Sequence, residues 1–227
     1  MIKDKLVAKT IYISLIAQFI TTTISLHGLF YTLDPEDLIM KDILILEAIV
    51  QFVEAFFYLW VIWALKDLKL MTSRRYIDWF ITTPTMLVST IIFMEYQKRK
   101  EFNENPVHFW EFLSENQQQI MVIVFLNFMM LFMGILGETN IIQKKYAIPI
   151  GFIFFALSFQ FIYENYAKYT KIGYYLFLFL LFVWALYGFA ALMDVRMKNT
   201  IYNLLDIVSK NFYGLFIYYY IRQIGTL

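Results

Sequence analysis

The chain has 227 residues, of which 60% are hydrophobic and 20% aromatic, and its formal net charge is +1. This composition is more apolar than a soluble domain of the same length needs, so we expect a bilayer as the solvent. The near-neutral charge argues against a nucleic-acid surface, and the lack of cysteine excludes disulfides and thiol chemistry. With His27 and His108 as the remaining soft ligands, we expect no metal site and a protein that is not an enzyme.

Seven apolar segments are long enough to cross about 30 Å of hydrocarbon, which takes roughly 20 helical residues. The predicted helices cover residues 9–31, 36–65, 75–97, 118–138, 146–166, 174–194 and 200–223. Pro35 ends the first helix and opens the second, the charged stretch 66–74 precedes the third, and residues 98–117 form one long polar connection. We therefore expect an all-α fold: one seven-transmembrane helix bundle over 1–227, with MIKDKLVAKT as a short tail.

A charge inside a membrane helix is costly and therefore indicates a functional site unless it lies near a helix end, and five ionisable residues stand out. They are Glu47, Glu54, Asp78, Asp206 and Lys210. Asp206 and Lys210 are four residues apart, which places the carboxylate near the amine on one helix face. Two readings fit this pair. It is either a structural ion pair, or a nucleophilic lysine that forms an imine with an aldehyde and uses the carboxylate as counter-ion.

The motifs RYIDWFITTP at 75–84 and LDIVSK at 205–210 decide between these readings. Both resemble the third- and seventh-helix patterns of microbial rhodopsins, and of bacteriorhodopsin in particular. The resemblance implies all-trans retinal bound to Lys210 as a Schiff base, Asp78 and Asp206 as paired counter-ions, and Arg75 on their extracellular side. It also implies a set of residues that line the retinal: Trp79, Thr83, Met86, Met130, Gly134, Trp184 and Tyr187.

Two positions depart from the bacteriorhodopsin pattern. Gly188 stands where a proline of the sixth helix is expected, and Ala191 stands where a second tryptophan usually presses on the chromophore. The cavity near the retinal ring is therefore expected to be roomier or to be filled by other groups.

Outward proton pumps of this family carry a proton acceptor, a threonine and a carboxylic donor at three positions of the third helix. These positions hold Asp78, Thr82 and Ser89. Serine cannot act as a carboxylic donor, so a pump would need water or another acid for reprotonation.

Glu47, Gln51 and Glu54 project from one face of the second helix over about two turns. This set resembles the second helix of channelrhodopsins, where glutamates line a cation path. Packed beside the first and seventh helices, the face would meet further polar residues: Ser14, Gln18, Thr22, Ser25, Asn199 and Asn203. Plain hydrogen bonding between helices is the alternative for such residues, although a line of acids and amides also offers replacement ligands to a dehydrating cation. Asn127 and Thr83 are expected to join the third and fourth helices.

These features together most resemble the small rhodopsins of giant viruses that infect algae, in the group that behaves as light-gated cation channels. The resemblance implies conduction of monovalent cations and protons through a bilayer, and it raises calcium block and a homo-oligomer as further expectations. In the expected mechanism, Lys210 loses its Schiff-base proton to Asp78. Constrictions would form at Arg75, at Glu54 with Asn203, and at Glu47.

Two other functions stay open at this point. An outward proton pump would use Glu47 or a water chain in place of the missing donor. A photosensor would signal to a partner, but the seven helices leave no stretch for an output domain. For orientation, the distribution of lysine and arginine favours an inside N-terminus. The resemblance implies the opposite, and we follow it: a multi-pass protein with its N-terminus outside and its C-terminus in the cytoplasm.

Overall fold

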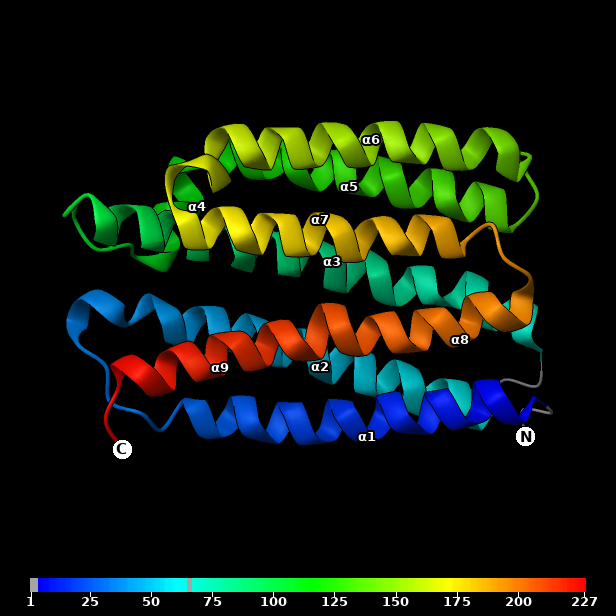
Figure 1. Cartoon of the computed structure of the whole chain (residues 1–227), viewed down its shortest axis with the longest axis horizontal. Helices are drawn as coiled ribbons and strands as arrows, with labels where there is room; N and C mark the ends of the chain where they lie inside the picture. Colours follow the sequence, from blue (N-terminus) through cyan, green and yellow to red (C-terminus); the bar gives the residue numbers. More distant parts are fainter. Residues whose placement is uncertain (1–3, 65–66) are drawn as a thin grey trace.

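Seven membrane-crossing units lie side by side in the computed structural model, which describes residues 4–64 and 67–227 (Figure 1). Six are single helices: α1 (Lys5–Gly28), α2 (Ile39–Ala64), α3 (Leu68–Glu101), α5 (Gln117–Glu138), α6 (Lys144–Asn165) and α7 (Lys171–Ala190). The seventh crossing combines α8 (Val195–Asp206), η3 (Ile207–Asn211) and α9 (Phe212–Ile224). Three short elements lie in connections: η1 (Pro35–Asp37), α4 (Phe109–Glu115) and η2 (Ala167–Tyr169). The predicted all-α seven-helix class is confirmed.

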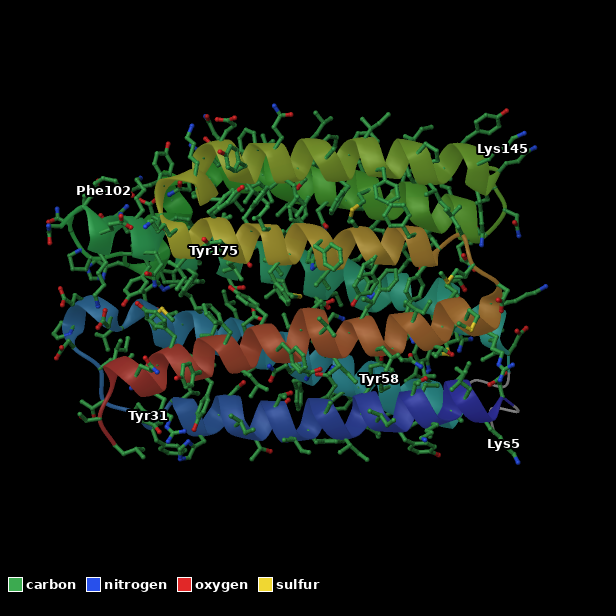
Figure 2. The ribbon with its side chains drawn as sticks, in the orientation of Figure 1. Lys5, Tyr31, Tyr58, Phe102, Lys145 and Tyr175 are labelled. Carbon is green, nitrogen blue, oxygen red and sulfur yellow. The ribbon has the colours of Figure 1, made fainter. Side chains whose placement is uncertain are left out.

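An odd number of crossings places the two termini at opposite ends of the bundle (Figure 1). We call these the N-terminal end and the C-terminal end. Figure 2 shows Lys5 and Lys145 at the N-terminal end, and Tyr31 and Phe102 at the C-terminal end.

The side chains are distributed as a bilayer requires. Large apolar side chains such as Phe56, Phe125 and Phe182 are 57–66% exposed, whereas Gln18 and Glu54 are fully buried. Polar groups inside and apolar groups outside reverse the pattern of a soluble protein, because hydrocarbon rather than water surrounds the helices. The chain is an integral, multi-pass membrane protein.

Three helices, α1, α3 and α8, begin four or more residues earlier than predicted because an aspartate caps each one. Asp4, Asp67 and Asp194 accept hydrogen bonds from the backbone N–H groups of the first helical turn, as N-caps do. The prediction that 66–74 separates the second and third helices was therefore wrong from Leu68 onward, since those charged residues are helical. Leu65 and Lys66 lie outside the described residues.

The predicted polar connection 98–117 is also partly helical. The helix α3 runs unbroken past Pro84 and ends at Glu101, and α4 occupies the middle of the connection. Asn103 follows α3 with φ of 54°, a left-handed conformation that asparagine tolerates better than most residues. In contrast, α7 ends at Ala190, four residues before the predicted end at Asp194.

The seventh crossing contains one π-helical turn, η3, in which the N–H of Phe212 bonds the carbonyl oxygen of Ile207, five residues earlier. A π-turn inserts one extra residue into a helix and is frequent at functional sites. Lys210 lies within this turn.

Candidate functional site

Lys210 lies at the centre of the bundle among three carboxyl groups. Its Nζ is 2.9 Å from Oδ2 of Asp78, 3.0 Å from Oε1 of Glu54 and 3.8 Å from Oδ1 of Asp206. All four residues are at most 3% exposed. The sequence predicted Asp78 and Asp206 beside the amine, and the structure adds Glu54 from α2.

Asp206 connects this centre to Arg75. Its Oδ2 accepts hydrogen bonds from Nη1 of Arg75 at 2.8 Å and from the hydroxyl of Tyr58 at 2.6 Å. Its Oδ1 accepts a hydrogen bond from the hydroxyl of Tyr187 at 2.8 Å, and that hydroxyl also contacts Oγ of Ser209. Arg75 lies toward the N-terminal end of α3. If all were ionised, three carboxylates would face two cations, so a neutral cluster requires one proton on a carboxyl group, because unbalanced buried charge is costly.

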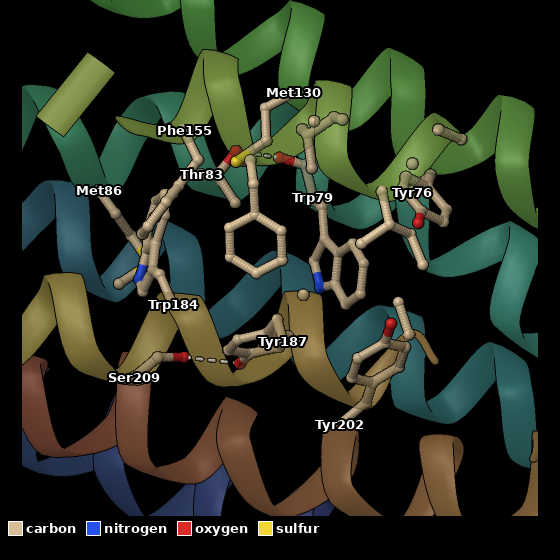
Figure 3. A pocket seen from close by; sticks show the side chains of 18 of the residues that line it. Tyr76, Trp79, Thr83, Met86, Met130, Phe155, Trp184, Tyr187, Tyr202 and Ser209 are labelled. Atoms are coloured by element: carbon tan, nitrogen blue, oxygen red, sulfur yellow. Dashed lines mark hydrogen bonds between the residues drawn. The ribbon is translucent and has the colours of Figure 1, made fainter. Parts of the chain in front are cut away.

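A cavity extends from Lys210 between α3, α5, α6 and α7, with about 800 Å³ of empty space when the open space at its mouth is included. Figure 3 shows Trp79 from α3 and Trp184 from α7 pointing into it, and the bond between Ser209 and Tyr187 at its edge. Its lining includes every residue that the sequence assigned to the retinal: Trp79, Thr83, Met86, Met130, Gly134, Trp184, Tyr187 and Lys210. The lining is mostly apolar and aromatic, as in sites that bind apolar ligands.

The ring of Phe152 fills the space that Gly188 leaves open. A Cβ placed on Gly188 would lie 2.4 Å from Cζ of Phe152, too close for any side chain without movement of that ring. The sequence left two possibilities for this region, a roomier cavity or one filled by other groups. At Gly188 the space is filled, by Phe152. Ala191 also lines the cavity.

A second set of buried polar residues lies on the other side of Lys210, between α1, α2, α3 and the seventh crossing. We call it the polar seam, and each of its members is at most 5% exposed: Thr10, Ser14, Gln18, Thr21, Ser25, Glu47, Gln51, Glu54, Ser89, Asn203 and Asn211.

The middle of the polar seam joins directly to Lys210 through Glu54. Nε2 of Gln18 donates to Oε2 of Glu54 and to Oδ1 of Asn211, while Nδ2 of Asn211 donates to Oε1 of Gln18 and to Thr21. Glu54 thus lies between the amine and the amides of α1 and η3.

Asn203 belongs to the N-terminal end of the polar seam, which corrects the expected pairing with Glu54. Its Oδ1 accepts from Nη2 of Arg75, its Nδ2 donates to Thr10 at 2.8 Å, and its backbone oxygen accepts from Ser14. The central group is instead Glu54 with Gln18 and Asn211.

Toward the C-terminal end, the polar seam continues through Gln51 and Glu47. Ser25 donates to Oε1 of Gln51 at 3.2 Å, and Ser89 donates to Oε1 of Glu47. Gly214 of α9 makes room here, because a Cβ on it would lie 2.0 Å from Nε2 of Gln51 and 3.8 Å from Cβ of Glu47.

Two residues expected on the helix-two face make no hydrogen bond to it within the described residues. Asn199 donates to Thr72 at 2.8 Å and to the backbone oxygens of Leu68 and Val195, so it joins the seventh crossing to the start of α3. The hydroxyl of Thr22 is buried, and it has no hydrogen-bond partner within the described part of the chain.

The two threonines of α3 bond backbone oxygens of their own helix. Thr82 donates to the carbonyl of Asp78 and not to its carboxylate. Thr83 donates to the carbonyl of Trp79 and accepts from Nδ2 of Asn127 at 2.8 Å, so the predicted bond between the third and fourth crossings is confirmed.

Sequence reasoning missed Tyr58 and Asn211. Tyr58 follows Glu54 by four residues and so extends the same helix face, which was an available signal. Asn211 had no such signal, because its direction depends on the π-helical turn of η3.

Comparison with known proteins places the chain in a family. A sequence profile described as bacteriorhodopsin-like protein matches residues 9–224. The structure is similar to that of viral rhodopsin OLPVRII, with a TM-score of 0.84, 27% identity and coverage of 98% of this chain and 100% of that one. It is also similar to Exiguobacterium sibiricum rhodopsin, with a TM-score of 0.76, 20% identity and coverage of 98% and 99%. No curated protein sequence matches significantly.

The chain belongs to the bacteriorhodopsin-like family of microbial rhodopsins. Membership implies a retinal chromophore held by a lysine Schiff base and supports light-driven ion transport. The residues present fit such a group: an apolar, aromatic-lined cavity ends at a buried primary amine with carboxylates beside it.

Proposed function

We propose that this protein is a light-gated channel for monovalent cations and protons. The observation that carries the proposal is the polar seam, whose acids and amides run from Arg75 past Lys210 to Glu47. Such a line of carboxylate and amide oxygens supplies the replacement ligands that a dehydrating cation needs.

In this proposal, Lys210 holds all-trans retinal as a Schiff base, and the other cavity residues bind and orient its chain. Retinal supplies light absorption and a change of shape on isomerisation. Asp78 accepts the proton from Nζ of Lys210, since its Oδ2 is 2.9 Å away. Asp206 remains paired with Arg75, which keeps a negative charge beside the amine.

Three groups of residues would constrict the ion path. Arg75 with Asn203 forms the outer constriction, Glu54 with Gln18 and Asn211 the central one, and Glu47 with Ser89 the inner one. Because the central group bonds directly to the amine of Lys210, loss of the proton from Nζ changes the partner of Glu54. This contact gives light-driven proton transfer a direct route to the ion path.

We place the N-terminus outside and the C-terminus in the cytoplasm, following the family resemblance against the lysine and arginine count. Accessibility of an epitope tag at each terminus in unpermeabilised cells tests this orientation. If only the C-terminal tag is accessible from outside, the N-terminus lies in the cytoplasm. The assignment of the outer and inner constrictions is then reversed.

One observation favours an outward proton pump as a second candidate. Ser89 stands at the position of the pump donor and hydrogen-bonds Glu47, so a carboxyl group does lie beside that position on a neighbouring helix. In a pump, Glu47 would reprotonate the amine, and Glu47→Gln would slow recovery of the pigment while the current stays unidirectional.

Voltage-clamp recording with wild type and Glu54→Gln tests the channel. We expect a wild-type photocurrent that reverses near the Nernst potential of sodium or potassium and that falls at least about fivefold in Glu54→Gln, since losing one ligand interaction of about 1 kcal/mol changes an equilibrium by that factor. Glu164→Gln, at an exposed residue of α6, is the matched control. Addition of external calcium then tests block. An outward current at every voltage, or an unchanged current in Glu54→Gln, contradicts this assignment of the path.

A further inference from the structure

The inner face of α2 changes character beyond Glu47. Toward the C-terminal end it carries Ile43 and Met40, both fully buried, before the face becomes acidic again at Asp37 of η1. Ten residues separate Asp37 from Glu47, which corresponds to roughly 15 Å at the rise of an α-helix. The polar seam therefore ends at Glu47 and is followed by an apolar segment.

Buried apolar residues of α3 and α9 accompany this segment in the hydrophobic core. Phe93 and Ile217 are fully buried and belong to the same hydrophobic cluster as Ile43 and Met40. The ring of Phe93 lies 5.6 Å from that of Tyr220, so aromatic contact joins α3 to α9 at this level. We call Met40, Ile43, Phe93 and Ile217 the apolar plug.

Asp37, Tyr96 and Lys100 form a charged group on the side of the plug that faces the C-terminal end, and we call this group the clasp. The hydroxyl of Tyr96 donates to Oδ1 of Asp37. Nζ of Lys100 donates to the same oxygen at 2.7 Å and lies 3.2 Å from the hydroxyl of Tyr96. The side chain of Asp37 is 5% exposed and that of Lys100 is 42% exposed. The ammonium group thus caps a buried carboxylate at the mouth of the bundle.

The clasp lies in line with the polar seam. Asp37 precedes α2, and Tyr96 and Lys100 occupy the last turns of α3. The ring of Tyr96 lies 6.1 Å from that of Tyr220 in α9. The clasp therefore joins the start of α2 to α3, the two helices that hold Glu47 and Ser89, and Tyr220 of α9 lies beside it.

We infer that the apolar plug is the inner gate of the ion path, that the clasp holds it shut, and that Asp37 with Tyr96 is the cation exit site which the ammonium of Lys100 fills in the closed state. The inference rests on the proposed channel function. An apolar constriction blocks ions because water does not fill it. Separation of α2 from α3 would hydrate the plug and withdraw Lys100 from Asp37, which frees the carboxylate for a passing cation.

A purely structural clasp would predict something different. It would anchor η1 to α3, and its loss would lower stability and leave the kinetics of the photocurrent unchanged. The rate of channel closing after the light is switched off therefore separates the two roles.

The test compares Tyr96→Phe and Lys100→Gln with wild type by voltage clamp. Each variant weakens the clasp, and Tyr96→Phe does so without a change in charge. We expect the channel to close roughly two- to fivefold more slowly, because each change removes a partly exposed ion pair or one hydrogen bond. Lys98→Gln is the matched control, because Lys98 lies in the same helical turn and bonds Glu95. It should close at the wild-type rate. The reversal potential should stay unchanged in Tyr96→Phe.

The apolar plug is tested separately with Ile43→Ser, which should hydrate the gate and raise the cation current in darkness. Absorption of the retinal-loaded protein reports folding of every variant, and Lys100→Gln, at a partly exposed side chain, keeps the test open if Ile43→Ser does not fold. A reversing wild-type current with unchanged closing in both clasp variants overturns the gate and leaves the channel standing. A wild-type current that does not reverse overturns the channel, and the gate with it.

Discussion

The side chains on the two sides of Lys210 differ in polarity. On the side of α5, α6 and α7 lies an apolar cavity lined by aromatic rings and methionines. On the side of α1 and α2 lies the polar seam, whose hydroxyl, amide and carboxyl groups are equally buried. The helix α3 and the seventh crossing contribute to both, and Lys210 is the residue at which they meet. One side is suited to hold an apolar chromophore, and the other to hold water and ions.

On each side, a glycine leaves space that a neighbouring side chain fills. At Gly188 the neighbour is the ring of Phe152, and at Gly214 it is the amide of Gln51. The same chemical change, glycine to alanine, therefore disturbs the cavity at one position and the polar seam at the other. This pair of substitutions can separate what each side does.

The largest effect is expected from Lys210→Ala, which removes the residue shared by both sides. The variant should form no pigment with all-trans retinal and give no photocurrent. Loss of the amine also leaves Asp78 and Glu54 without their cation, which should destabilise the protein by about 3–5 kcal/mol. Absorption spectra and thermal unfolding of the purified protein measure both effects.

Lys171→Ala serves as the control, because Lys171 is exposed at the start of α7. It should keep wild-type absorption. A coloured Lys210→Ala protein would refute the assignment of the retinal site. Lys210 would then no longer connect the cavity with the polar seam.

A smaller effect is expected from Gly214→Ala. The new Cβ would lie 2.0 Å from Nε2 of Gln51, so the amide must move and its bond to Ser25 is disturbed. Loss of a contact worth about 1 kcal/mol should lower the cation current about fivefold. The absorption maximum should stay at the wild-type value, because Gly214 does not line the cavity. A changed absorption maximum with an unchanged current would show that Gly214 affects the cavity and not the polar seam.

The sequence located the charged residues at the centre because charges in apolar helices are rare and therefore conspicuous, and the family resemblance supplied their expected roles. Asp78 and Lys210 lie 132 residues apart and still meet at 2.9 Å, as the two motifs implied. Glu54 was recognised as intramembrane, but its direct contact with Lys210 depends on how α2 packs against the seventh crossing. Helix periodicity gives the face of a helix and does not give its partner.

The errors have two local physical causes. Aspartate caps extend helices into charged stretches, so a reading by hydropathy starts α3 at Arg75, seven residues after its first residue, Leu68. The π-turn of η3 adds a residue within the seventh crossing, so Asn211 meets Gln18 of α1, where a regular helix had suggested Asn203 near Glu54. Neither a cap bond nor a π-turn is visible in the spacing of apolar residues.

The smallest effect on the cation current is expected from Gly188→Ala, the counterpart of Gly214→Ala in the cavity. The added methyl group would lie 2.4 Å from the ring of Phe152, which must rotate or shift, and overpacking of this kind costs about 1–3 kcal/mol. Because Phe152 lines the cavity, its movement should shift the absorption maximum, while the reversal potential and the size of the cation current should stay as in wild type. Phe152→Leu combined with Gly188→Ala should restore stability if the ring is the obstacle. If Gly188→Ala instead reduces the current as strongly as Gly214→Ala does, the cavity and the polar seam act as one unit rather than as two separable sides.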